Sequence, residues 1–199
     1  MSKYYAVKNG KQIGVFLTWE ECEKQVKGFK GALYKSFPTK EQALEYIEGQ
    51  KVVENITGGL IAYVDGSYND KNKVYGYGCV LLEGQEVVQQ FYGKGNDQDY
   101  VSMRNVAGEI MGSEVAIRYA IDKDYKLICI YYDYEGIEKW ANKTWKANKV
   151  GTIAYQKFIE ESRQKIQISF VKVLAHSGDM YNEVADKLAK RAVGIKWKE

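Results

Sequence analysis

The sequence predicts an α/β protein of two parts: a small ββαβα unit, then a larger unit with a five-stranded mixed sheet flanked by helices. Two observations carry this prediction. Short apolar, strand-like segments alternate with segments of helical periodicity along the 199 residues. Hydrophobic residues make up 45% of the chain, which is enough to build packed cores.

The small unit occupies the first residues of the chain. Asn9-Gly10 is a typical hairpin turn between two strand-like segments. Thr18 and Glu21 form a capping-box pattern, which predicts the start of a helix. The expected order is strand, strand, helix, strand, helix, at residues 3–8, 12–17, 19–27, 32–37 and 39–48.

The larger unit begins with three strands joined by short turns, which predicts an antiparallel meander. The five expected strands cover residues 59–66, 74–83, 86–93, 126–133 and 167–174. The four expected helices cover about 105–121, 134–148, 152–163 and 181–193. We place the small domain at 1–49, a short linker at 50–57 and the larger domain at 58–199.

The sequence argues against a membrane-spanning segment, a signal peptide and a zinc site. No run of about 18 apolar residues is present, and the first residues lack the apolar region of a signal peptide. The three scattered cysteines, Cys22, Cys79 and Cys129, predict reduced thiols and a cytoplasmic protein, and a single histidine argues against a zinc site.

Residues 1–50 carry 8 lysines and 6 acids, whereas residues 58–199 carry 20 bases and 19 acids. A near-neutral larger domain would gain from a basic accessory domain if the substrate were nucleic acid.

Four acidic residues are candidates for a catalytic site. Asp65 and Asp133 each stand at the end of an apolar strand, so they emerge side by side if these strands are neighbours. Glu109 and Asp186 lie in the first turns of two helices. Each has an ordinary alternative, because an aspartate after a strand is often a turn residue and acids favour helix N-termini.

Taken together, these four acids favour a metal site. Carboxylates that cluster without cationic partners repel one another, and divalent cations remove that repulsion. Hard oxygen ligands suit Mg²⁺ or Mn²⁺. Two such ions about 3.5–4 Å apart can activate a water and stabilise the oxygens of a phosphoryl displacement.

Residues 58–194 resemble the catalytic domain of type 1 ribonucleases H. The shared strings, in order, are YVDGSYN, GEIMG, IYYDYEGI and AHSGDMYNEVADKLAK. The resemblance implies a ribonuclease H-like fold whose four acids hold two Mg²⁺, with Asp65 bridging both, and which cuts RNA in RNA–DNA hybrids to leave 5′-phosphate and 3′-hydroxyl ends. The alternatives are an inactive hybrid-binding module, or another nuclease of this fold such as a resolvase or transposase core.

The resemblance also assigns supporting roles around the acids. His176 matches a loop histidine that assists proton movement or product release, and Glu183 would tune the metal environment. Their alternatives are an exposed loop histidine and a solvated helix acid. Gly66, Ser67 and Asn105 would contact the RNA ribose or a base edge, although Asn105 also suits a helix N-cap. The sequence departs from the family pattern in having Val106 after the asparagine and Glu135 where glutamine is frequent.

Two further segments contain candidate residues for binding the hybrid. In residues 140–149, Trp140 would face the DNA strand, and lysines spaced by three would share a helical face; the alternative is a solvated face over core aromatics. Residues 3–47 resemble a hybrid-binding domain, which implies contacts from Tyr5, Trp19, Tyr34 and Lys35. Ser36 stands where a second basic residue is common, and Trp19 could instead belong to a small core. We expect a monomer whose partner is the RNA–DNA hybrid.

Overall fold

The computed structural model describes residues 3–48, 58–173 and 179–196. The chain forms two compact units, Met1–Glu54 and Asn55–Glu199. The linker expected at 50–57 lies outside the described residues. No helix in the described ranges is long and apolar enough to cross a membrane.

The first unit has the predicted ββαβα order. Its antiparallel sheet has the strand order β2-β1-β3. Ala6 and Val7 of β1 face opposite sides, where Ala6 packs with residues of α2 and Val7 packs with residues of α1. The two helices therefore cover the two faces of the sheet. The elements are β1 (Tyr4–Asn9), β2 (Gly14–Phe16), α1 (Trp19–Val26), β3 (Leu33–Phe37) and α2 (Lys40–Glu48).

Local caps explain where these helices begin. Thr18 is the N-cap of α1, its hydroxyl accepts from the Glu21 backbone N–H, and the Glu21 carboxylate accepts from the Thr18 backbone N–H. The Thr39 hydroxyl accepts from the Gln42 backbone N–H in the same way at α2. The predicted capping box is therefore confirmed.

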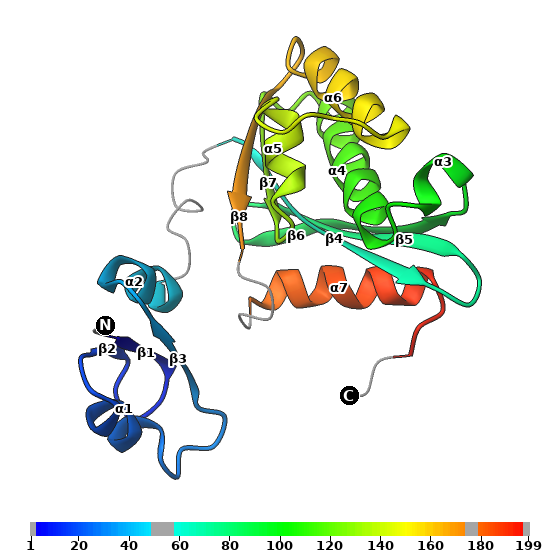
Figure 1. Cartoon of the computed structure of the whole chain (residues 1–199). Helices are drawn as coiled ribbons and strands as arrows, with labels where there is room; N and C mark the ends of the chain where they lie inside the picture. Colours follow the sequence, from blue (N-terminus) through cyan, green and yellow to red (C-terminus); the bar gives the residue numbers. More distant parts are fainter. Residues whose placement is uncertain (1–2, 49–57, 174–178, 197–199) are drawn as a thin grey trace. The chain divides into compact units, whose positions relative to one another are not determined.

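The second unit is a five-stranded mixed sheet flanked by helices, as predicted. Its strand order is β6-β5-β4-β7-β8, with β4, β5 and β6 antiparallel and β4, β7 and β8 parallel. Figure 1 shows α4, α5 and α6 on one face of this sheet and α7 on the other. The elements are β4 (Leu60–Asn69), β5 (Val74–Glu83), β6 (Glu86–Gly95), α3 (Gln98–Val101), α4 (Asn105–Asp122), β7 (Leu127–Tyr132), α5 (Gly136–Ala141), α6 (Val150–Ser162), β8 (Gln167–Lys172) and α7 (Met180–Ala192).

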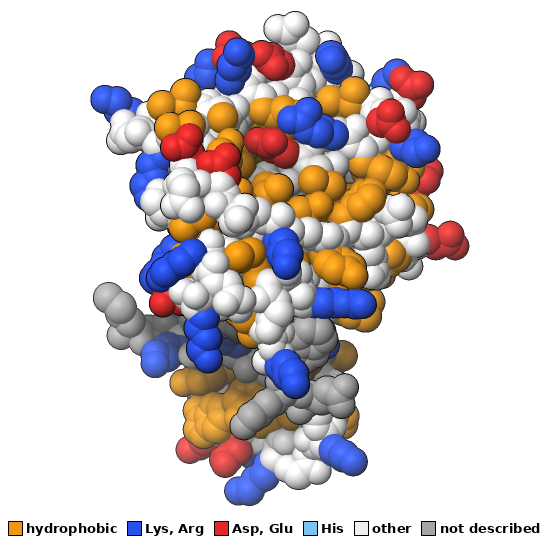
Figure 2. Space-filling view, turned by 90° about the vertical axis from the view of Figure 1, so that its right-hand side faces the viewer, with side chains coloured by type: hydrophobic (Ala, Val, Ile, Leu, Met, Phe, Trp, Pro, Cys, Tyr) orange, Lys and Arg blue, Asp and Glu red, His pale blue; other side chains and the backbone are white. Residues whose placement is uncertain are grey.

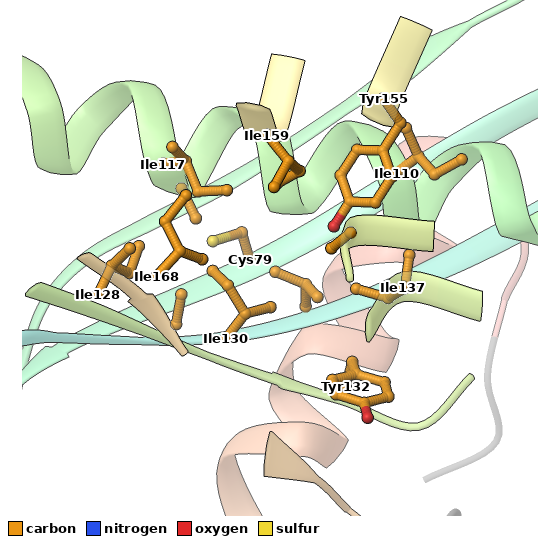
Figure 3. Close-up of a cluster of buried hydrophobic side chains, with 14 of the residues drawn as sticks. Cys79, Ile110, Ile117, Ile128, Ile130, Tyr132, Ile137, Tyr155, Ile159 and Ile168 are labelled. Carbon is orange, nitrogen blue, oxygen red and sulfur yellow. The ribbon is translucent and has the colours of Figure 1, made fainter. Parts of the chain in front are cut away.

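The main core lies between the sheet and the helices α4 to α6. Alternate residues of β7, Ile128, Ile130 and Tyr132, point into it and meet Ile110 and Ile117 of α4 (Figure 3). All five are buried. This anchoring fixes the end of β7 and the start of α4, where the candidate acids lie.

Three details differ from the sequence-based expectation. β4 continues past Asp65 to Asn69, because its second half still pairs with β5. A short helix, α3, lies between the expected strand at 86–93 and the expected helix at 105–121, in a segment for which no helix was predicted. The helix expected at 134–148 ends at Ala141, and residues 142–149 are not helical. The prediction that the lysines of residues 140–149, which are Lys143, Lys146 and Lys149, share one helical face was therefore wrong.

Candidate active site

Asp65 and Asp133 come from neighbouring parallel strands. β4 and β7 pair from Leu60↔Ile128 to Tyr63↔Tyr131. Asp65 lies two residues beyond the last pair, and Asp133 follows directly after β7. Although Asp65 is inside a long strand and not at its end, it stands where the parallel pairing stops. The two aspartates therefore meet as the sequence predicted.

Glu109 joins these aspartates because α4 lies against the backbone of the sheet. A Cβ on Gly66 would lie 2.0 Å from the Asn105 carbonyl oxygen, and a Cβ on Gly108 would lie 1.9 Å from the Gly76 carbonyl oxygen. Any side chain at Gly66 or Gly108 would push α4 away from β4. With α4 in place, one carboxylate oxygen from each of Asp65, Glu109 and Asp133 lies within 4.8 Å of the others.

Asp186 approaches from the opposite face on α7. Gly78 stands directly opposite Asp65 in the β4–β5 pairing. A Cβ on Gly78 would lie 2.0 Å from the Ala185 carbonyl oxygen, so α7 touches the sheet one residue before Asp186. The Asp186 carboxylate is close enough to Asp65 to raise its pKa, although Asp186 lies outside the group of three.

Burial and mutual repulsion dominate the electrostatics of the site. Burial, and then the charges of Asp133 and Asp186, raise the pKa of Asp65 to about 7, against the opposing effect of the Gly66 N–H donor at 2.6 Å. Burial, and then Asp133 and Asp65, hold the pKa of Glu109 well above its ordinary value. Glu109 is 1% exposed, and among the described residues its Oε2 has no hydrogen-bond partner.

This arrangement fits a divalent cation. A buried carboxylate oxygen without a partner is costly, and a cation among the three carboxylates would remove that cost. The donor set consists only of carboxylate oxygens, which suits a hard ion such as Mg²⁺ or Mn²⁺. The residues present therefore fit a metal centre.

The other predicted residues near the acids have different surroundings. Ser67 is buried, and Gly66 lies against the first turn of α4. Asn105 is the first residue of α4, whereas the N-cap is Arg104, so the alternative of an Asn105 cap was wrong. Glu183 is exposed in the first turn of α7. His176 lies outside the described residues.

Trp140 belongs to an aromatic cluster beside Asp133. Its ring centroid lies 5.8 Å from that of Tyr134 and 6.0 Å from that of Trp145. Lys139 Nζ lies over Trp145, 4.8 Å from the ring centroid. Glu135, where the sequence departs from the family pattern, forms ion pairs with Lys139 and Lys172 at 2.5 Å each. Aromatic and basic groups thus lie together next to the acids.

In the first unit, three of the four predicted contact residues lie together. The ring of Trp19 lies 5.9 Å from Tyr5 and 5.7 Å from Tyr34. Trp19 and Tyr34 are 42% and 45% exposed, so they are not core residues. Lys35 is on the other face of the sheet, since it pairs with Ala6 whereas Tyr34 pairs with Val7.

Sequence reasoning missed three contributors to the site. Gly76 and Gly78, alternate residues of a strand, mark a close approach of another backbone, and this signal was present in the sequence. Lys190 forms an ion pair with Asp186 at 2.6 Å, and its spacing of four residues could have revealed the pair.

Comparison with known proteins agrees with this architecture. Residues 57–194 match the ribonuclease H family, and residues 3–47 match the ribonuclease H1 N-terminal domain. Human ribonuclease H1 is 25% identical over 253 aligned positions, covering 94% of this chain and 88% of that protein. Ribonuclease H1 from Halobacterium salinarum has a similar fold, with a TM-score of 0.58 and 22% identity over 69% of this chain and 98% of the other. LC11-RNase H1 in complex with an RNA/DNA hybrid has a TM-score of 0.54 and 13% identity, over 67% of this chain and 99% of that one.

The fold and these matches define the protein as a nuclease, an enzyme that hydrolyses nucleic acid. The chain belongs to the ribonuclease H family.

Proposed function

We propose that this protein hydrolyses the RNA strand of RNA–DNA hybrids at a centre formed by Asp65, Glu109, Asp133 and Asp186. The observation that carries the proposal is the meeting of three carboxylates within 4.8 Å, with a buried oxygen of Glu109 that has no partner among the described residues. The ribonuclease H match over residues 57–194 gives this cluster its reaction class.

The four acids would hold two Mg²⁺ ions, with Mn²⁺ as a substitute. When bound, the ions would activate a water and stabilise the oxygens of the phosphodiester, which yields 5′-phosphate and 3′-hydroxyl ends. Asp65 lies near Glu109 of α4 and near Asp186 of α7, so it would be the ligand common to the acids of both helices. Cation binding would also keep Asp65 and Glu109 ionised, although burial raises the pKa of both.

Around this centre, the protein's own groups would recognise the two strands. Backbone groups of Gly66 and Ser67, with Asn105, would contact the RNA ribose, whose 2′-hydroxyl distinguishes RNA from DNA. Trp140 would lie against the DNA strand. His176 would assist proton movement or product release, and Glu183 would tune the metal environment. Support comes from the contact of Gly66 with the start of α4, which holds this backbone beside Glu109.

The N-terminal unit would strengthen binding of the same hybrid. Tyr5, Trp19 and Tyr34 present neighbouring, tilted rings, and aromatic side chains on which bases can stack are one part of a nucleic-acid surface. Lys35 would reach a phosphate from the edge strand β3. A solved structure that shares this fold holds an RNA/DNA hybrid, which supports the choice of partner.

Residues 58–199 carry 20 bases and 19 acids, so net charge does not by itself indicate a polyanion site on the larger domain. On the face drawn in Figure 2, lysine and arginine side chains lie among acidic and hydrophobic ones. The carboxylate geometry and the N-terminal aromatic surface therefore carry the functional argument. We also propose a monomer in a cytoplasmic setting, and the three buried free cysteines support the cytoplasmic setting.

The test is a substrate panel with the full chain and Mg²⁺. Labelled RNA–DNA hybrid, double-stranded RNA, double-stranded DNA and a four-way junction are incubated separately, and the ends of the products are identified. We expect cleavage of RNA in the hybrid alone, with 5′-phosphate ends. Cleavage of the junction in preference to the hybrid would indicate a resolvase, and hybrid binding without any cleavage would indicate an inactive binding module.

A further inference from the structure

α7 places a cation directly beside the candidate metal centre. Lys190 Nζ lies 2.6 Å from Asp186 Oδ2, and the two side chains are 33% and 32% exposed. The residues are four apart with the acid on the N-terminal side, which is the favourable orientation for such a pair on a helix. The contact therefore forms within one rigid element and needs no partner from elsewhere.

The ammonium group of Lys190 neutralises the charge of Asp186, which is one of the four acids that would hold the ions. A metal ion bound at Asp186 would carry out the same neutralisation, so lysine and ion compete for one carboxylate.

We propose that Lys190 is an internal counter-cation that must leave Asp186 before a metal ion binds there, and that it thereby sets the cation concentration the enzyme needs. The inference rests on the proposed function, because it assumes that Asp186 is a metal ligand. A lysine suits this role since its flexible stem lets the ammonium move into water once the ion has arrived. Lys190 is then a positioning residue that acts through Asp186.

Removing the charge should strengthen cation binding. A partly exposed ion pair contributes up to about 1 kcal/mol, which corresponds to roughly fivefold in a dissociation constant. We expect Lys190→Met to bind Mn²⁺ about fivefold more tightly than the unmodified protein. Lys190→Arg keeps a cation at the same place, so it should not bind Mn²⁺ more tightly than the unmodified protein.

The experiment is calorimetric titration of Mn²⁺ into the full chain at fixed salt, with thermal unfolding recorded without divalent cations. Lys187→Met is the matched control, because it removes the same charge from an exposed position on the same helix. If Lys190 only stabilised α7, Lys190→Met would lower the unfolding temperature and leave the Mn²⁺ affinity unchanged. Lys190→Gln replaces the methionine variant if that variant does not fold.

Tighter Mn²⁺ binding in Lys190→Met, but not in Lys187→Met or Lys190→Arg, supports the inference. Equal affinities in Lys190→Met and Lys187→Met overturn it, while hybrid cleavage by the unmodified protein leaves the proposed function intact. If the unmodified protein neither binds Mn²⁺ nor cleaves the hybrid, the proposed function fails and the inference fails with it.

Discussion

We predict that the Asp65 carboxylate destabilises the folded protein when no divalent cation is bound, and that replacing Asp65 with asparagine relieves this destabilisation. Burial and the neighbouring acids raise the pKa of this carboxyl from 3.8 to about 7. Between these values the folded state binds a proton that the unfolded state has released. Stability of the cation-free protein therefore falls as pH rises through this window and levels off above about pH 7.

The size of the effect follows from the pKa difference. Each pH unit corresponds to about 1.4 kcal/mol, so a rise from 3.8 to about 7 amounts to about 4 kcal/mol above pH 7. Asparagine has the same shape, and its amide oxygen can still accept from the Gly66 N–H. Asp65→Asn should therefore raise the unfolding temperature of the cation-free protein by roughly 10 °C at pH 8, with a smaller gain at pH 5.

The assay is thermal unfolding of both proteins in EDTA at pH 5 and pH 8. Adding Mg²⁺ should stabilise the unmodified protein and leave Asp65→Asn almost unchanged, because the cation binds the charged cluster. Asp70→Asn is the control, since Asp70 is exposed and paired with Lys73 and Arg104, and it should give no gain. An Asp65→Asn variant that is no more stable than the unmodified protein at pH 8 would refute this electrostatic reasoning.

Two further perturbations test the parts that surround the acids. Gly78→Ala places a Cβ 2.0 Å from the Ala185 carbonyl oxygen, so we expect it to cost about 1–3 kcal/mol of stability and to weaken Mn²⁺ binding by displacing α7. Gly14→Ala, whose Cβ would meet only the Phe16 ring at 3.7 Å, is its control, and an unchanged Mn²⁺ affinity in Gly78→Ala would contradict the packing argument. Trp19→Ala should weaken hybrid binding by about 1–3 kcal/mol, measured by fluorescence anisotropy, and should preserve the cleavage rate at saturating hybrid. Equal hybrid affinity of Trp19→Ala and the unmodified protein would show that Trp19 does not contribute to hybrid binding.

The strands of the larger unit, and the meeting of Asp65 with Asp133, were predictable from the sequence. β4 and β7 are strongly apolar segments, and an aspartate near the end of each predicts a meeting point once the strands are neighbours. The exact end of β4 was not predictable from its own residues, because β5 alone extends the pairing beyond Asp65. The site depends on where the parallel pairing stops, and this is a property of two strands together.

Glu109 and Asp186 required more than local chemistry. Their positions depend on glycines that let two helices touch the sheet, and these contacts join segments far apart in the chain. The resemblance to the ribonuclease H family, and not local chemistry, predicted that Glu109 and Asp186 belong to the site. The packing of the two helices on the sheet explains their positions. Residues 142–149 had the lysine spacing of a helix, but Lys143, which follows the C-cap Asn142 of α5, adopts a positive φ of 58° that ends the helical conformation.

The central claim is that the carboxylate cluster performs cleavage of RNA in the hybrid. The most direct measurement compares Asp133→Asn with the unmodified protein for binding and for Mg²⁺-dependent cleavage of the same labelled hybrid. We predict that Asp133→Asn binds the hybrid with near-normal affinity and loses cleavage by at least about a hundredfold, since one ligand charge is removed from the centre. Near-normal cleavage by Asp133→Asn would contradict the account.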